Sequence, residues 1–543
     1  MRPLTTLSSV LCLLAALPAQ ANKRNASGGP LRPDQACFDV LHYGLDLRVD
    51  PAAKSIAGTL TMRAKWLAPQ PSFVLDLDPA LAVESVTLDQ KSVPYERDAG
   101  RIVVKPATAL AAGAEFTVVV GYGGTPHEAR NPPWDGGFTW KQTKDGKPWI
   151  ATSCQGEGAD LWWPCKDHPS DKPDGFDLVC TIPKGLVLAS NGVLAVEPKT
   201  EGAWTTFHWR TRQPIANYNI ALNIAPYVEL KETYTCIDGT KMPFQMWVLP
   251  ESQERAKRCM QQFQDHLHVF EQLLGPYPFR SEKYGVAETP HLGMEHQTII
   301  AYGNGFRDEQ YDWLHNHELA HEWWGNLVTC RDWKDMWLHE GFGTYMQPLY
   351  REIRFGPKAY ADEIAKYRMM HRTPLAPRES KDSHEIYFGA SGNDIYYKGS
   401  AVLHTLRWHM GDGPFAAALR KFCYPTEAAQ KATDGSQVRF VDTDDFVRLC
   451  SDLANEDLAW FFDVYVRQPS LPRLQWEKKD GTLSLRWLVP GDLKFELVVP
   501  VVLGGKEVRV PMPGGKGTLP VGDADWRLDP NQRLLMGKPV EAR

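Results

Sequence analysis

Two histidines four residues apart, with a glutamate directly after the first, are the residues of this chain best suited to chemistry. His317 and His321 enclose Glu318, and Glu340 follows nineteen residues after His321. Positions four apart lie on one face of an α-helix, so both imidazoles can bind one metal ion. Glu318 would then lie beside the metal as a general base. Glu340, from a second helix, would be the third protein ligand.

Two imidazoles, one carboxylate and an open fourth position form the ligand set of a catalytic zinc ion, which lowers the pKa of its bound water to about 7. A structural zinc more often has four protein ligands, frequently thiolates. We therefore expect one Zn²⁺ per chain and a hydrolytic reaction. The alternative is an ordinary amphipathic helical segment, since so short a pattern also arises by chance in a long chain.

The elements that must position these residues fall into three regions. Between about Phe38 and Tyr227 apolar residues alternate with polar ones, which predicts the half-buried strands of an antiparallel β domain. From about Glu251 to Arg467 apolar residues recur in steps of three and four, which predicts helices. Beyond Pro469 the alternation returns and predicts a small β domain.

The chain has 543 residues, enough for three or four domains. We expect an N-terminal β domain over 22–227, the catalytic domain over 228–468 and a C-terminal β domain over 469–543. Residues 130–175 are rich in Pro, Gly and Trp and show no regular period. A long irregular segment in a compact domain is often functional.

The sequences around the histidines add specificity to the zinc hypothesis. HELAHEWWGNLVT and WLHEGFGTY, with eighteen residues between His321 and Glu340, resemble the gluzincin aminopeptidases of the M1 family. The resemblance implies a multidomain α+β protein of the bacterial exported type, with a thermolysin-like, mainly helical catalytic domain. It also implies a zinc-dependent aminopeptidase, which acts on peptides with a free N-terminus.

An aminopeptidase must hold the α-ammonium of its substrate at a fixed distance from the metal, and oxygen acceptors do this. His291-Leu292-Gly293-Met294-Glu295-His296 resembles the family's GxMEN motif, with Glu295 in the place of the amine-binding glutamate and Gly293 and Met294 as substrate-binding neighbours. Leu292 and His296 depart from the family's glycine and asparagine. Gln155 aligns with a second amine-binding position, where other members carry glutamate. A neutral amide binds ammonium less strongly, so Glu295 should supply most of the charge.

Tyr396 is the candidate to stabilise the oxyanion of the tetrahedral intermediate. Ile395-Tyr396-Tyr397-Lys398-Gly399 resembles the family's Y-x-K-G motif, and only Tyr396 has the family's offset to Lys398. Asn326 and Glu322, expected on the same helix as the histidines, are candidates to support the metal ligands.

Composition and the N-terminal residues limit the cellular location and the binding partners that the protein can have. The formal charge of −6 provides no basic surface for nucleic acid. Arg2, an apolar stretch over 10–17 and Ala19-Gln20-Ala21 predict a signal peptide cleaved after Ala21, and hence a periplasmic or secreted protein. That stretch is too short to span a bilayer, which needs about 20 apolar residues, and no later segment looks membrane-spanning. Nine cysteines remain after cleavage, without a CxxC pair, so a cysteine-based metal site is not indicated.

These observations together predict a zinc aminopeptidase in which Glu318 is the base. Two alternatives stay open. A zinc endopeptidase of the thermolysin type would use the same helix without an amine-binding group, and a catalytically silent binding module could share the fold. The sequence leaves the preferred N-terminal residue and the oligomeric state open.

Overall fold

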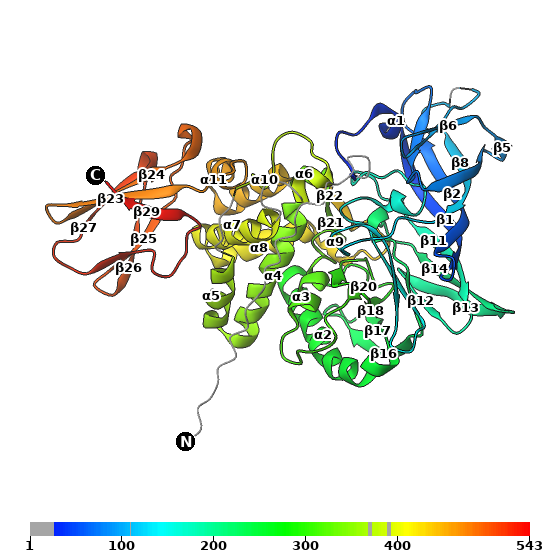
Figure 1. The fold of residues 1–543 in the computed structure, drawn as a ribbon. Coiled ribbons are helices and arrows are strands. Elements are labelled where there is room, and N and C mark those ends of the chain that lie inside the picture. Colours follow the sequence, from blue (N-terminus) through cyan, green and yellow to red (C-terminus); the bar gives the residue numbers. More distant parts are fainter. Residues whose placement is uncertain (1–25, 109, 368–371, 388–392, 543) are drawn as a thin grey trace, which may run out of the picture.

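The computed structural model describes residues 26–108, 110–367, 372–387 and 393–542. The predicted signal peptide lies outside these residues. Strands form the N-terminal part and the C-terminal part, and a mainly helical region lies between them (Figure 1). The predicted α+β fold class is confirmed. Among the described residues, no helix combines the length and the apolar character needed to cross a membrane.

The N-terminal part is built on one large sheet in which β1 pairs in parallel with β11 and antiparallel with β2. Alternate residues of β1, such as Tyr43, Leu45 and Leu47, are buried, as the alternation predicts. The strands in spatial order are β13 (Val193–Glu201), β14 (Trp204–Thr211), β11 (Phe176–Pro183), β1 (Phe38–Asp50), β2 (Ser55–Trp66), β8 (Glu115–Gly124), β4 (Leu81–Leu88) and β5 (Lys91–Ser92). A separate small sheet holds β3 (Phe73–Asp76), β7 (Arg101–Val104) and β6 (Tyr95–Asp98), next to the short helix α1 (Pro33–Ala36).

The segment over 130–175, which shows no period in the sequence, contains regular structure. It forms the hairpin of β9 (Gly137–Gln142) and β10 (Pro148–Ser153), and β10 pairs with β15 (Asn223–Ala225), which also pairs with β12 (Val187–Ala189). Trp162 and Trp163 are fully buried after the 3₁₀ turn η2 (Ala159–Leu161), whereas Trp134 is 52% exposed. The segment therefore contributes residues to the hydrophobic core as well as to the protein surface.

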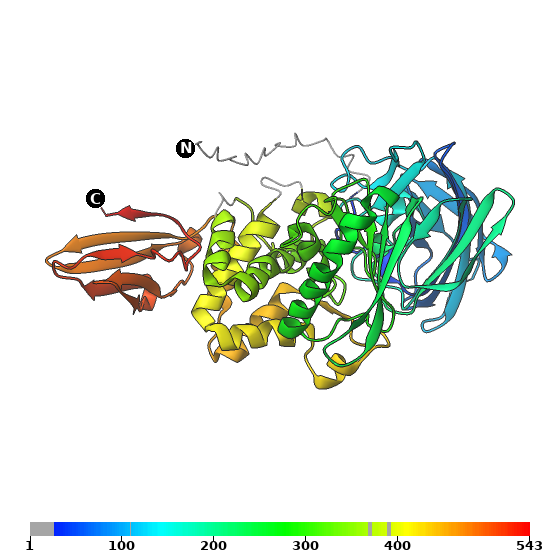
Figure 2. The ribbon, with the colours of Figure 1, turned by 90° about the horizontal axis from the view of Figure 1, so that it is seen from below.

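The central region combines a five-stranded sheet with a helical bundle (Figure 2). The sheet order is β16 (Val228–Thr235), β17 (Lys241–Val248), β18 (Tyr284–Glu288), β20 (Ile300–Tyr302) and β19 (Gly293–Met294). The helices are α2 (Gln253–Leu274), α3 (Trp313–Ala320), α4 (Trp337–Phe355), α5 (Pro357–Lys366), α6 (Ser383–Tyr387), α7 (Asp394–Met410), α8 (Asp412–Cys423), α9 (Glu427–Lys431), α10 (Thr443–Ala454) and α11 (Ala459–Tyr465). Two short strands among these helices, β21 (Val328–Cys330) and β22 (Arg439–Val441), pair in parallel. Helix α2 ends before Gly275, which caps it with a φ of 113°.

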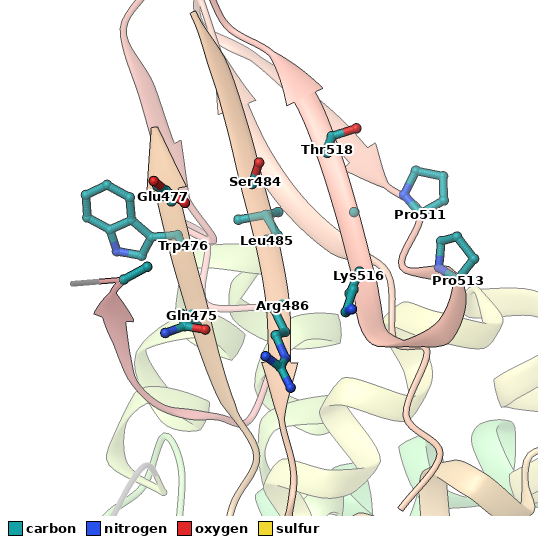
Figure 3. A pocket seen from close by; sticks show the side chains of 12 residues that line it. Gln475, Trp476, Glu477, Ser484, Leu485, Arg486, Pro511, Pro513, Lys516 and Thr518 are labelled. Atoms are coloured by element: carbon teal, nitrogen blue, oxygen red, sulfur yellow. The ribbon is translucent and has the colours of Figure 1, made fainter. Parts of the chain in front are cut away.

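The C-terminal strands form two further sheets that project from the helical region (Figure 1). One contains β27 (Lys516–Pro520), β24 (Thr482–Leu488), β23 (Arg473–Lys479) and β29 (Gly537–Glu541), and the other contains β26 (Lys506–Val510), β25 (Val499–Leu503) and β28 (Trp526–Leu528). Side chains of β23, β24 and β27, among them Gln475, Arg486 and Lys516, line an open pocket on the first sheet (Figure 3). None of the candidate site residues lines this pocket.

Candidate active site

The three predicted metal ligands converge on one point. The Nε2 atoms of His317 and His321 are 3.2 Å apart, and they lie 3.6 and 3.4 Å from Oε2 of Glu340. His321 and Glu340 are buried, and the side chain of His317 is 13% exposed. All three donor atoms lie within 4.8 Å of one another, so one metal ion can contact all of them.

Helix α3 positions the two histidines, although it ends at Ala320, one residue before His321. His321 keeps helical backbone angles, with φ −66° and ψ −16°, so the four-residue spacing still places both rings on one side. The Asp312 side chain caps the start of the helix by accepting a hydrogen bond from the backbone N–H of His315. Asn326 and Glu322 therefore lie after the helix, not on it.

Neighbouring groups orient the ligands toward the metal position. Nδ1 of His321 donates to the carbonyl of Trp324 at 2.8 Å, which leaves the lone pair on Nε2 free for a metal. Oε1 of Glu340 accepts hydrogen bonds from Nε2 of Gln155 at 3.1 Å and from the hydroxyl of Tyr387 at 2.9 Å. Within the described residues, Oε2 of Glu340 is buried and accepts no hydrogen bond. A buried carboxylate oxygen without a donor, aimed at two imidazole nitrogens, fits a divalent cation.

The charges of the site also favour the binding of a divalent cation. Burial and then the neighbouring Glu295 raise the pKa of Glu318 well above its usual value. Burial raises the pKa of Glu295 to about 7, and Glu340 adds to this effect. Burial acts on Glu340 in the same direction, but His321 and His317 outweigh it and hold the pKa of Glu340 well below its usual range. Three carboxylates gathered in a buried space repel one another, and a divalent cation would relieve that repulsion.

Gly293 lies directly against the candidate base. A Cβ atom at this position would lie 2.5 Å from Oε1 of Glu318 and 2.7 Å from the side chain of Leu314. Only glycine therefore lets strand β19 approach helix α3 this closely. Met294, the next residue, is buried and pairs with Ala301 of β20.

Glu295 is buried at the end of this strand and receives hydrogen bonds from both sides. Its Oε1 accepts from Nε2 of Gln155 and, at 3.0 Å, from the hydroxyl of Tyr218. Its backbone carbonyl accepts from Nδ2 of Asn326 at 3.0 Å. The carboxylate is thus fixed close to the metal ligands.

Gln155 bridges the predicted amine-binding group and the metal ligands. Its amide nitrogen donates to Glu295 and to Glu340, so its amide oxygen is the atom left to accept a hydrogen bond from a ligand. Glu295 and Gln155 can therefore present oxygen atoms side by side to an ammonium group.

The structure separates the two adjacent tyrosines of α7. The ring of Tyr396 lies 6.0 Å from the ring of His317, between centroids, whereas Tyr397 stacks on Tyr367 at 5.3 Å. Burial, followed by the three site glutamates, raises the pKa of Tyr396 well above its usual value, so its hydroxyl remains a donor at neutral pH. Tyr396 faces the metal site and Tyr397 does not.

Two residues that contact the site have no signal in the sequence. Tyr218, in the 3₁₀ turn η3 (Asn217–Asn219), reaches Glu295, and Tyr387, at the end of α6, reaches Glu340. Each makes its contact across more than 40 residues of chain, which no local pattern reveals.

The sequence matches two profiles of known families. Residues 40–218 match the Peptidase M1 N-terminal domain, and residues 295–465 match the Peptidase family M1 domain. The chain belongs to peptidase family M1. The resemblance to this family is confirmed, and His317, His321 and Glu340 form a group that could bind a zinc ion.

Relatives within the M1 family include aminopeptidases from several kingdoms. Leucine aminopeptidase 2 of Saccharomyces cerevisiae is 27% identical over 364 residues, which cover 61% of this chain and 49% of that protein. Aminopeptidase B of Mus musculus is 26% identical over 373 residues, which cover 62% of this chain and 53% of that protein. The chain spans about half the length of the curated relatives it matches.

Solved structures share the fold. The crystal structure of the M1 zinc metallopeptidase from Deinococcus radiodurans superposes with a TM-score of 0.66 at 23% sequence identity, and covers 82% of this chain and 95% of that one. The M1 arrangement of a β domain followed by a helical catalytic domain is thus confirmed for this chain.

Proposed function

We propose that this M1 protein is a zinc-dependent aminopeptidase that removes N-terminal residues from peptides. The observation that carries the proposal is the position of the Glu295 carboxylate. It is buried, and Gln155 connects it directly to the metal ligand Glu340. A substrate ammonium held there would place the first peptide bond, and no later one, beside the metal position.

His317, His321 and Glu340 are the residues that would hold the zinc ion. When bound, zinc supplies Lewis-acid polarisation of the scissile carbonyl and lowers the pKa of a coordinated water. Side chains of this chain would carry out the proton transfer, stabilise the oxyanion and bind the substrate ammonium.

Glu318 accepts the proton of the attacking water and delivers it to the leaving amine. Tyr396 donates its hydroxyl hydrogen to the oxygen that becomes negatively charged in the transition state. Glu295 and Gln155 hold the substrate ammonium, and this binding sets the register.

A panel of aminoacyl fluorogenic substrates tests the proposal with the wild-type protein, the chelated wild type and Glu318→Gln. We expect activity in the wild type, none after chelation, and a loss of about 10²–10⁴-fold in kcat for Glu318→Gln. Activity that survives both chelation and the substitution would refute the mechanism.

We also propose that the enzyme is exported to the periplasm or secreted, on the strength of the predicted signal peptide. The N-terminal mass of the protein purified from fractionated cells tests this. A chain that begins at Asn22 and lies outside the cytoplasm is the expected result, and a chain that begins at Met1 in the cytoplasm would contradict it.

A further inference from the structure

Two residues that follow the predicted signal peptide, Ser27 and Gly28, contact elements that support the active site. We call this pair the N-terminal strap. Ser27 is only 3% exposed although it lies close to the start of the chain. Its backbone N–H donates to Oγ of Ser383 at 3.1 Å, and its carbonyl accepts from the N–H of Ser383 at 3.0 Å. Gly28 also forms a β-bridge with Asp382, so the strap pairs with the residues that begin α6.

The first connection to the site runs through α6. Oγ of Ser383 donates to the carbonyl of Gly156, the neighbour of Gln155. At the other end of the same short helix, the hydroxyl of Tyr387 donates to Oε1 of Glu340. The strap therefore holds an element that contacts both the Gln155 loop and a metal ligand.

The second connection runs through Trp333, in the 3₁₀ turn η5 (Trp333–Asp335). Its indole N–H donates to Oγ of Ser27 at 3.1 Å, and its ring packs edge-on against Tyr218 at 5.8 Å. Tyr218 in turn donates to Oε1 of Glu295. Trp333 also contacts His339, the neighbour of Glu340, with 6.3 Å between the ring centroids.

Of the two adjacent glycines Gly28 and Gly29, only Gly28 has no room for a methyl group. Gly28 and the following Gly29 both have positive φ angles, of 75° and 83°. A Cβ on Gly28 would lie 2.4 Å from Cδ1 of Trp333, whereas a Cβ on Gly29 would have its nearest neighbour at 3.6 Å, on Asp382. A methyl group at either position strains the backbone similarly, but only at Gly28 does it displace Trp333.

We propose that the N-terminal strap is a positioning element of the active site. It holds Tyr387 against Glu340 and Tyr218 against Glu295, and so it fixes the metal ligand and the amine-binding carboxylate relative to each other. The inference rests on the proposed aminopeptidase function. Cleavage after Ala21 leaves the strap intact, whereas trimming the chain beyond Ser27 removes it.

The full-length enzyme tests this with the matched pair Gly28→Ala and Gly29→Ala. Two quantities are measured: the KM for an aminoacyl amide, and the Zn²⁺ affinity in competition with a chelating indicator. We expect Gly28→Ala to raise KM and to weaken Zn²⁺ binding about tenfold, because residues that support metal ligands have effects of this size. Gly29→Ala should stay within about twofold of the wild type in both, because its Cβ does not reach Trp333.

Equal effects of the two substitutions would overturn the proposal, because backbone strain alone would then explain both. If Gly28→Ala does not fold, Ser27→Ala replaces it, since it removes the acceptor of the Trp333 N–H without adding atoms, and it should weaken Zn²⁺ binding in the same direction. An unchanged Zn²⁺ affinity in Ser27→Ala would then overturn the proposal. A wild type without peptidase activity would refute the proposed function instead, while the Zn²⁺ competition would still report on the strap.

Discussion

The side-chain amide of Asn326 donates a hydrogen bond of 3.0 Å to the backbone carbonyl of Glu295. The same amide nitrogen lies 3.3 Å from Oε2 of Glu322, and Oδ1 of Asn326 accepts from Asn219 at 2.6 Å. Asn326 follows the two histidine ligands closely in the chain, so this bond connects the metal site to the predicted amine-binding group. In our account, the distance between these two groups decides which peptide bond is cut.

Replacing Asn326 by alanine should therefore affect substrate binding more than a buried asparagine elsewhere would. The substitution leaves the Glu295 carbonyl and the Asn219 amide without a partner, which should lower the free energy of unfolding by about 1–3 kcal/mol. We expect a rise in KM for aminoacyl amides as well, because Glu295 loses its anchor. Asn223→Ala is the matched control, since Asn223 is fully buried and, among the residues that the structure describes, its amide nitrogen donates only to the carbonyl of Ala189. A similar KM in both variants would argue against this role of Asn326.

Tyr396 and Tyr397 of α7 offer a matched pair of substitutions that tests which hydroxyl stabilises the oxyanion. Tyr396→Phe should lower kcat by about 10²-fold or more, because it removes a donor aimed at the developing negative charge. Tyr397→Phe should leave kcat nearly unchanged, since the phenyl ring can keep the stack on Tyr367. Steady-state kinetics on one aminoacyl substrate distinguish the two. The reverse order of effects would show that the motif has been placed one residue out of register.

Removal of the metal should destabilise the fold as well as abolish activity. A ligand that binds only the folded protein stabilises it by about 2.7 kcal/mol at a concentration 100 times its Kd. We expect Zn²⁺ to raise the Tm of the chelated wild type, and to leave the Tm of His321→Ala unchanged, because that variant lacks one of the three ligands. Differential scanning calorimetry measures both. An equal rise in the two proteins would indicate that Zn²⁺ binds elsewhere.

His266 should make the stability of the protein depend on pH. The residue is fully buried on α2, and burial lowers its pKa to about 3, with a smaller opposing effect from Asp265. In the unfolded chain the imidazole takes up a proton below about pH 6.5, whereas in the folded protein it stays neutral down to about pH 3. The unfolded state binds the extra proton in this window, so the free energy of unfolding falls as the pH falls, by about 1.4 kcal/mol per pH unit.

His266→Gln should reduce that slope by about 1.4 kcal/mol per pH unit between pH 5.5 and 4.5. Urea unfolding followed by tryptophan fluorescence gives the slope. His268→Gln, at an exposed position two residues along the same helix, is the control for the substitution itself. A slope that is the same in His266→Gln and the wild type would contradict the argument.

Local patterns predicted the elements that carry the metal ligands. The three- and four-residue steps of the helical region, and the spacing of His317, His321 and Glu340, depend on residues close together in the chain. The alternation of β1 also predicted which of its residues are buried. These signals are strong because one helix or strand determines them.

The remaining features depend on contacts between distant segments. Strand β10 pairs not only with the adjacent β9 but also with β15, more than 70 residues away, and no local pattern indicates the second pairing. Tyr218 and Tyr387 reach the site in the same way. The orientation of Gln155 could not be predicted either, because it follows from two carboxylates that approach from β19 and α4.

We propose above that the enzyme binds the free N-terminus of a peptide and cleaves the first peptide bond. One pair of peptides tests this most directly. A peptide and its N-acetylated form are incubated with the wild-type enzyme and Zn²⁺, and the products are identified by mass spectrometry. We expect sequential loss of single residues from the free peptide and no cleavage of the acetylated one, because Glu295 and Gln155 need an ammonium group to bind. Efficient cleavage of the acetylated peptide at internal bonds would contradict it and would favour an endopeptidase.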